Sequence, residues 1–254
     1  MTGETNLIRP ATLRQLPRTG QTAVSQAGDD GTYQAGMPLT AAQRFVDRGD
    51  GTVLDLAFHP PLQWVKQPEL IIPGATGVHA TNQIQAARGN WANATAYAAA
   101  DLAKDTVGST YWVCAVAHTS AAGPTTFAED RAAHPTYWRE TIWTASAANL
   151  TTPATMAWAA AIVNCVGLAY AGYDDWRLPN LLELWSLIRL NAAVGTNAIA
   201  VAFPNPQSQY TSSSTYHQNA LYSPIIQYYY DQTAVQLKTS NYYVRPVRGG
   251  RVIA

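Results

Sequence analysis

The chain has 254 residues, of which 47% are hydrophobic and 13% charged, and its formal net charge at pH 7 is zero. A chain of this length can bury a sizeable core, either as one domain or as two smaller ones. The neutral charge balance argues against an electrostatic nucleic-acid binder, and no apolar run approaches the roughly 20 residues that a membrane helix needs. We therefore expect no nucleic-acid partner and no membrane insertion.

The first 42 residues have no clear hydrophobic period and contain turn-forming clusters at 28–31 and 36–38. We interpret residues 1–42 as an extension that docks on its own domain or on a neighbouring subunit. Residues 1–6 lack the basic region and apolar core that begin a secretory signal peptide. We therefore expect the protein to be assembled in the cytoplasm of its host.

Residues 45–66 are predicted to form a β-hairpin and its continuation. The pair Asp50-Gly51 between two apolar runs is a strong hairpin signal. A calcium site is the alternative, because Asp47, Asp50 and Asp55 lie close together in the sequence. The EF-hand pattern fails, since a glycine and a phenylalanine occupy two of its ligand positions. We predict a turn without a metal.

The segment 68–150 is too long for a structureless loop and carries its own aromatic side chains. These are Trp91, Tyr97, Tyr111, Trp112, Phe127, Tyr137, Trp138 and Trp143. Large aromatic residues supply the apolar area that a small domain needs for a core. Their spacing also resembles the small three-stranded carbohydrate-binding modules of chitinases and phage tail proteins. We predict an inserted small all-β subdomain over 68–150, with Trp91 and Trp112 as candidate ligand contacts.

Two segments with a helical hydrophobic period flank residues 171–180. The apolar stripe of the first comprises Trp158, Ile162, Cys165, Val166 and Ala169. The stripe of the second comprises Leu181, Leu184, Trp185 and Ile188. These patterns predict a tight helix–loop–helix corner with Trp176 buried inside it, and the corner is structural rather than catalytic.

The composition of this corner predicts how it is held together. Gly172 suits a left-handed stop after the first helix, and Pro179 suits the opening of the second. We expect Arg177 to tie the corner by pairing with Asp174 and Asp175.

The corner sequence, A-G-Y-D-D-W-R-L-P-N, resembles a motif of the Lcl C-terminal domain family, named after a bacterial collagen-like adhesin. Three further stretches resemble motifs of that family in the right order, at 44–55, 62–66 and 242–250. The resemblance implies an α+β, C-type-lectin-like fold of two helices plus an antiparallel sheet, used for adhesion and ligand binding without shared catalytic residues. We expect the lectin-like domain to comprise 43–67 and 151–254.

The run from 216 to 242 is rich in Tyr, Asn and Gln, a composition that binding loops use because Tyr offers much contact area at low entropic cost. In lectin-like folds this part supplies exposed strands and loops. Alternation along a strand would bury about half of these side chains instead. The candidate ligand contacts are Tyr216, Asn219, Tyr222, Tyr228, Tyr230, Asn241 and Tyr242.

No catalytic motif emerges from the sequence. The five histidines show no metal-binding spacing, and there is neither a G-x-S-x-G motif nor a phosphate-binding loop. Asp174 with Asp175, or Asp47 with Asp50, could act as the paired carboxylates of a glycosidase, but a turn explains each pair. We expect no enzyme activity, no metal and no cofactor. Cys114 and Cys165 fall in separate predicted units, as expected for buried free thiols.

These observations predict a receptor-binding or adhesion protein for host attachment that recognises a cell-surface ligand, with carbohydrate binding favoured over a protein receptor. We favour a phage tail-tip or fibre component, located on the virion tail or an extracellular surface. Such a subunit is expected to form a homotrimer and to contact other tail subunits. The alternative is a structural virion subunit that binds another protein, and a polysaccharide-degrading enzyme is a third possibility.

Overall fold

The computed structural model describes residues 44–74, 83–123, 125–188 and 202–249. The predicted docking arm at 1–42 lies outside these residues. Within them, three α-helices and four β-sheets give a mostly sheet α+β chain, which agrees with the predicted class. In these ranges, no helix is both long and apolar enough to cross a membrane.

The first sheet contains the predicted hairpin. Its strands are β1 (Phe45–Asp47), β2 (Thr52–Asp55), β3 (Leu62–Val65) and β15 (Val247–Gly249), antiparallel and in that order. Asp50 shapes the hairpin turn by accepting a hydrogen bond from the Thr52 N–H at 3.0 Å. Gly51 has φ +86°, and a Cβ there would lie 2.1 Å from the Tyr170 hydroxyl oxygen, so the turn requires glycine.

The aspartates of this turn all have protein partners. Asp47 pairs with Lys66, and both carboxylate oxygens of Asp55 accept hydrogen bonds from Arg44 at 2.7 Å. Among the described residues, no group of three or more His, Cys, Asp or Glu side chains could hold a metal ion.

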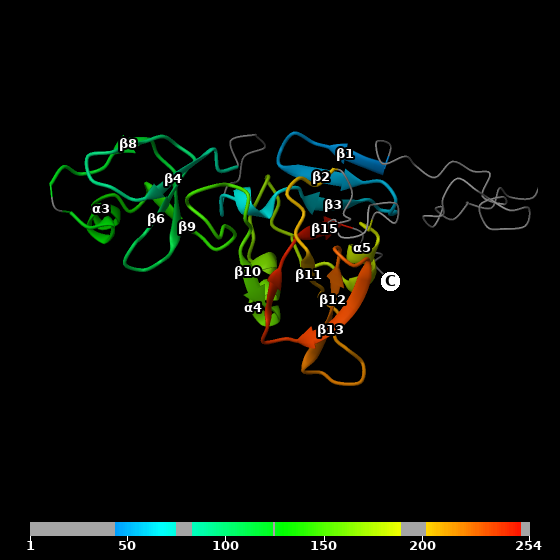
Figure 1. The fold of residues 1–254 in the computed structure, drawn as a ribbon. Helices are drawn as coiled ribbons and strands as arrows, with labels where there is room; N and C mark the ends of the chain where they lie inside the picture. Colours follow the sequence, from blue (N-terminus) through cyan, green and yellow to red (C-terminus); the bar gives the residue numbers. More distant parts are fainter. Residues whose placement is uncertain (1–43, 75–82, 124, 189–201, 250–254) are drawn as a thin grey trace, which may run out of the picture.

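The second sheet has the order β10-β14-β11-β12-β13. Its strands are β10 (Thr155–Ala157), β14 (Asn241–Tyr243), β11 (Gln209–Thr211), β12 (Tyr222–Gln227) and β13 (Gln232–Leu237). Only the β11–β14 pair is parallel. Figure 1 shows β13 as the outermost strand at this side of the molecule.

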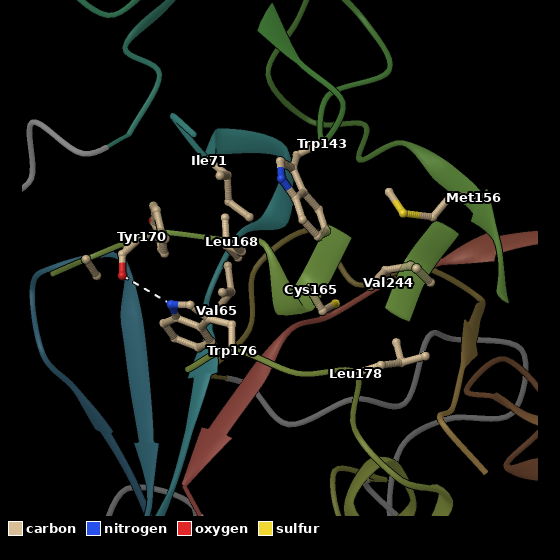
Figure 2. Close-up of a cluster of buried hydrophobic side chains, with 12 residues drawn as sticks. Val65, Ile71, Trp143, Met156, Cys165, Leu168, Tyr170, Trp176, Leu178 and Val244 are labelled. Atoms are coloured by element: carbon tan, nitrogen blue, oxygen red, sulfur yellow. Dashed lines mark hydrogen bonds between the residues drawn. The ribbon is translucent and has the colours of Figure 1, made fainter. Parts of the chain in front are cut away.

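Helices α4 (Trp158–Val166) and α5 (Leu181–Trp185) complete two hydrophobic clusters. One cluster joins α5 to the sheets through Leu184, Leu187, Trp64 and Tyr228. The other surrounds Trp176, whose side chain is 2% exposed and whose indole N–H donates to the Tyr170 carbonyl at 3.2 Å (Figure 2). The predicted burial of Trp176 is confirmed.

The prediction of where the helices beside the corner begin and end is wrong. Helix α4 ends at Val166, with Gly167 as its C-cap. Beyond it, the Ala169 carbonyl accepts the Gly74 N–H at 3.1 Å. Gly172, with φ +80°, instead lies in a turn between Tyr170 and Tyr173. Two residues assigned to the apolar stripes face solvent: Val166 is 61% exposed and Trp185 is 40% exposed.

The predicted pairing of Arg177 is also wrong. Its guanidinium binds Glu183 at 2.6 and 2.8 Å, because Glu183 forms a capping box with Asn180 at the start of α5. Pro179 precedes this cap. Asp175 pairs with Arg248 instead, at 2.5 Å.

A third sheet, β4-β6-β7-β9, lies to one side of the molecule with α3 (Phe127–Ala133) beside it (Figure 1). Its strands are β4 (Ala86–Asn90), β6 (Asp101–Lys104), β7 (Tyr111–Cys114) and β9 (Trp138–Thr141). A two-stranded sheet of β5 (Ala96–Tyr97) and β8 (His118–Thr119) adjoins it, and the short 3-10 helix η1 (Pro68–Leu70) leads into the region. The Thr144 hydroxyl donates to the Glu69 carbonyl at 2.6 Å, so the chain enters and leaves this region at neighbouring points. The prediction that this region is all-β is wrong, because α3 lies within it, and the boundaries 68 and 150 remain a prediction.

Candidate functional site

The structure divides the Tyr- and Asn-rich run into separate places. The loop before β12 and the turn after β12 lie at opposite ends of a strand of six residues. At about 3.4 Å per residue, the two ends are roughly 20 Å apart. The run therefore cannot form one small ligand site within a single chain.

Of these regions, the stronger candidate for a binding site is the end of the second sheet, where three segments meet. The β11–β12 loop, the β13–β14 turn and the first turn of α4 contribute to it. We call this region the loop surface, and it comprises Trp158, Thr215, Tyr216, His217, Asn219, Leu221, Tyr222 and Lys238.

Lys238 connects the three segments of the loop surface. Its ammonium donates to the Thr215 hydroxyl at 2.9 Å and lies 3.7 Å from the centroid of the Trp158 ring. Its backbone N–H donates to the Leu221 carbonyl at 2.9 Å, and its carbonyl accepts the Trp158 N–H at 3.1 Å. The Trp158 indole N–H donates to the Ser212 carbonyl at 2.9 Å, so the ring that supports the cation is itself fixed.

The β11–β12 loop is held by its own hydrogen bonds. The Tyr216 N–H donates to the Tyr222 carbonyl at 3.0 Å, and the Asn219 carboxamide oxygen accepts the Leu221 N–H at 3.0 Å. These bonds leave His217 and Asn219 exposed and Leu221 67% exposed. The loop therefore presents side chains on a preorganised backbone, which lowers the entropic cost of binding.

The chemistry of the loop surface suits recognition. It offers the Lys238 cation, the amide of Asn219, the imidazole of His217 and a partly exposed Tyr216 ring that lies 5.0 Å from the His217 ring. Apolar faces, hydrogen-bonding groups and one cation occur together here. Such a surface can bind a polar ligand that also has apolar faces.

The turn after β12 holds the second group of tyrosines. Tyr229 and Tyr230 are 42% and 60% exposed, with their ring centroids 4.9 Å apart. The prediction of Tyr228 as a ligand contact is wrong, because its side chain is fully buried and its hydroxyl donates to the Leu184 carbonyl at 2.8 Å. Burial raises the pKa of Tyr228 well above its usual range.

The other predicted contacts lie elsewhere. On β14, Asn241 is exposed, whereas Tyr242 is partly covered and lies opposite Met156 of β10. In the third-sheet region, the Trp91 ring stacks on Phe127 at 5.3 Å, and the Trp112 ring packs edge-on against it at 6.1 Å. Trp91 and Trp112 are therefore partly buried, because both rings pack against Phe127 of α3.

A cluster of ionisable side chains, Asp130, His118 and Cys114, also lies in the region of the third sheet. Asp130 is 1% exposed and accepts the Trp138 indole N–H at 3.0 Å, with His118 Nε2 3.5 Å from the same carboxylate. Cys114 lies next to His118, and burial raises the pKa of its thiol to about 11. A thiol with that pKa stays protonated at neutral pH and is a poor nucleophile. Cys165 is a separate, fully buried free thiol.

These features define an α+β protein whose best candidate site is a surface of fixed loops at the end of a sheet. Residues 133–248 match the Lcl C-terminal domain family. The matched region contains α4, α5 and the whole loop surface. This match supports a receptor-binding or adhesin-like role. No curated protein matches the chain.

The predicted ligand contacts did not include five members of the loop surface: Trp158, Thr215, His217, Leu221 and Lys238. Trp158 had been assigned to a buried helix stripe, and it lies 80 residues before Lys238 in the chain. No local pattern signals that contact, because the fold alone brings the first turn of α4 to the β13–β14 turn.

Proposed function

We propose that this protein is a non-catalytic receptor-binding or adhesion protein and that the loop surface contacts its ligand. The observation that carries the proposal is the Lys238 ammonium held on Trp158 beside the exposed side chains of His217, Asn219 and Leu221. Exposed apolar and aromatic residues in a polar setting mark interaction sites. The match of residues 133–248 to the Lcl C-terminal domain family supports the same role.

A cell-surface glycan is the ligand class that this chemistry fits best. Sugars have apolar C–H faces edged by hydroxyl groups, so Leu221 and Tyr216 can contact a face while Asn219 and Lys238 bind the edge. Such a surface is shallow, and a single contact is weak. Repetition of the site in an oligomer, or along a phage tail fibre in the setting that we propose, supplies the necessary avidity.

The C-type-lectin-like fold that the family resemblance implies supports this role, because those folds use loops at one end of a sheet for binding. We extend the proposal to the third-sheet region as an inserted subdomain over 68–150. Its half-exposed Trp91 and Trp112 are a second candidate for glycan contact.

The test measures binding of the purified full-length protein to a glycan array and to whole host cells. Leu221→Asp combined with His217→Ala should reduce binding at least about tenfold, with the free energy of unfolding changed by less than about 1 kcal/mol. Val107→Asp is the matched control, since Val107 is 88% exposed on another surface. Equal binding by the double variant and the parent contradicts the assignment.

The same measurement separates the alternatives. Binding that persists in the double variant but is lost in Trp112→Ala places recognition in the third-sheet region. Binding to purified virion subunits that free oligosaccharides do not compete supports a structural virion subunit. Release of new reducing ends from a bound polysaccharide supports a degrading enzyme.

A further inference from the structure

We propose that two copies of this chain pair antiparallel through the outer edge of β13, forming a continuous ten-stranded sheet. Strand β13 is last in the order of its five-stranded sheet, and its six residues pair with β12 in unbroken register. Within the described ranges, no segment pairs with its outer edge. Its backbone groups there need a partner strand or water.

The register shows which groups point outward. The Lys238 N–H donates to the Leu221 carbonyl, so the hydrogen-bonded pairs of this ladder recur at every second residue from that point. Thr233 and Val235 therefore direct their N–H and C=O groups away from β12, and Leu237 directs its N–H there, whereas the Leu237 carbonyl accepts the Ser240 N–H at 3.0 Å. The position of Pro224 agrees with this alternation, because Pro224 has no N–H to donate and lies opposite Val235.

The residue types of β13 leave this edge unprotected. Its sequence, Q-T-A-V-Q-L, contains neither a charge nor a proline, and Val235 and Leu237 are 39% and 43% exposed. The two edges of the third sheet are protected. Strand β9 carries Arg139 and Glu140, and β4 carries Arg88 with an irregular register. Natural edge strands usually carry such charges or irregularities to prevent pairing.

A second copy of the same strand fits the edge. The three outward-facing residues are symmetric about Val235, so a twofold axis there pairs Thr233 of one copy with Leu237 of the other. The charged residues that flank β13 favour the antiparallel direction, because Asp231 of one copy then lies near Lys238 of the other.

This pairing also joins the two groups of tyrosines that one chain keeps apart. In the antiparallel register, the Tyr229–Tyr230 turn of one copy lies beside the β13–β14 turn of the other, at about the 4.8 Å spacing of neighbouring strands. Each loop surface then gains Tyr230 from the second copy. This consequence rests on the proposed function, whereas the pairing itself does not.

The test of the pairing is the mass of the full chain in solution, which needs no ligand. Sedimentation and light scattering from about 1 to about 100 µM should give a mass near twice 27.4 kDa for the parent. Val235→Pro and Val235→Lys should both give monomers, since the outward N–H is lost in one and a charge is placed on the axis in the other. Val163→Lys is the control, because Val163 is 69% exposed on α4 and outside the edge.

Asp231→Asn, which tolerates the φ of +50° at this position, should shift the dimer to monomer at higher concentrations than the parent. A parent that is monomeric throughout the range overturns the proposal. So does a dimer or trimer whose mass is unchanged in both Val235 variants. If the pairing is confirmed but Tyr230→Ala leaves ligand binding unchanged, the joined site is wrong while the interface stands.

Discussion

Replacing Trp176 with alanine tests whether the corner between α4 and α5 anchors the fold. The Trp176 side chain is 2% exposed in the cluster shown in Figure 2. Its ring makes aromatic contacts with Tyr170 and Tyr173 at centroid distances of 6.2 and 6.5 Å. Truncation to alanine therefore removes a large buried ring and two aromatic contacts.

The expected cost follows from these contacts. Truncating a buried Trp typically costs about 3–5 kcal/mol from lost transfer free energy and the cavity. No unsatisfied polar group adds to it, because the Tyr170 carbonyl still accepts the Tyr173 N–H at 3.0 Å. We expect about 4 kcal/mol, which corresponds to a decrease of roughly 8–16 °C in Tm for a domain of this size.

Urea unfolding followed by tryptophan fluorescence and circular dichroism measures the change. Trp185→Ala is the matched control, since that side chain is 40% exposed on α5 and should cost less than about 1.5 kcal/mol. The reasoning is refuted if Trp176→Ala unfolds at the urea midpoint of the parent. It is also refuted if the control loses as much stability.

Three further outcomes are expected. Tyr228→Phe should lose about 1 kcal/mol of stability, from the buried hydrogen bond to Leu184, and leave ligand binding unchanged. Cys114 and Cys165 should resist alkylation at pH 8 in the native state and both react in urea, as mass spectrometry can show, because burial raises the pKa of each thiol. Burial acts to raise the pKa of Asp105, but the Arg131 guanidinium at 2.8 Å and backbone N–H donors hold that pKa below its usual value. A lowered pKa stabilises the fold above the unfolded value of about 3.9, so the stability deficit of Arg131→Ala should shrink as the pH falls from about 5 to 3. A deficit that does not vary with pH would contradict this pairing.

Local residue chemistry was enough to predict several elements. The Asp50-Gly51 pair determined the first hairpin, because few other residues accept the backbone conformation that this turn needs. The helical spacing of apolar residues located α4 and α5, and the motifs at 171–180 and 242–250 identified the family that residues 133–248 match, whereas the motifs at 44–55 and 62–66 lie outside that match. Each of these signals lies within a dozen residues along the chain, where sterics and periodicity act directly.

What the sequence could not determine depends on contacts between distant segments. Periodicity extended the first helix to Ala169, whereas α4 ends at Val166 and the Ala169 carbonyl accepts a hydrogen bond from Gly74, 95 residues earlier in the chain. Composition made Tyr228 and Tyr230 equivalent, yet α5 covers the first and leaves the second exposed. The sequence by itself determined the α+β class, the match of residues 133–248 to the Lcl C-terminal domain family and the position of the Tyr-rich run. Only the tertiary structure decided which tyrosines reach solvent and that Trp158 supports Lys238, because burial and cation placement depend on which segments pack together.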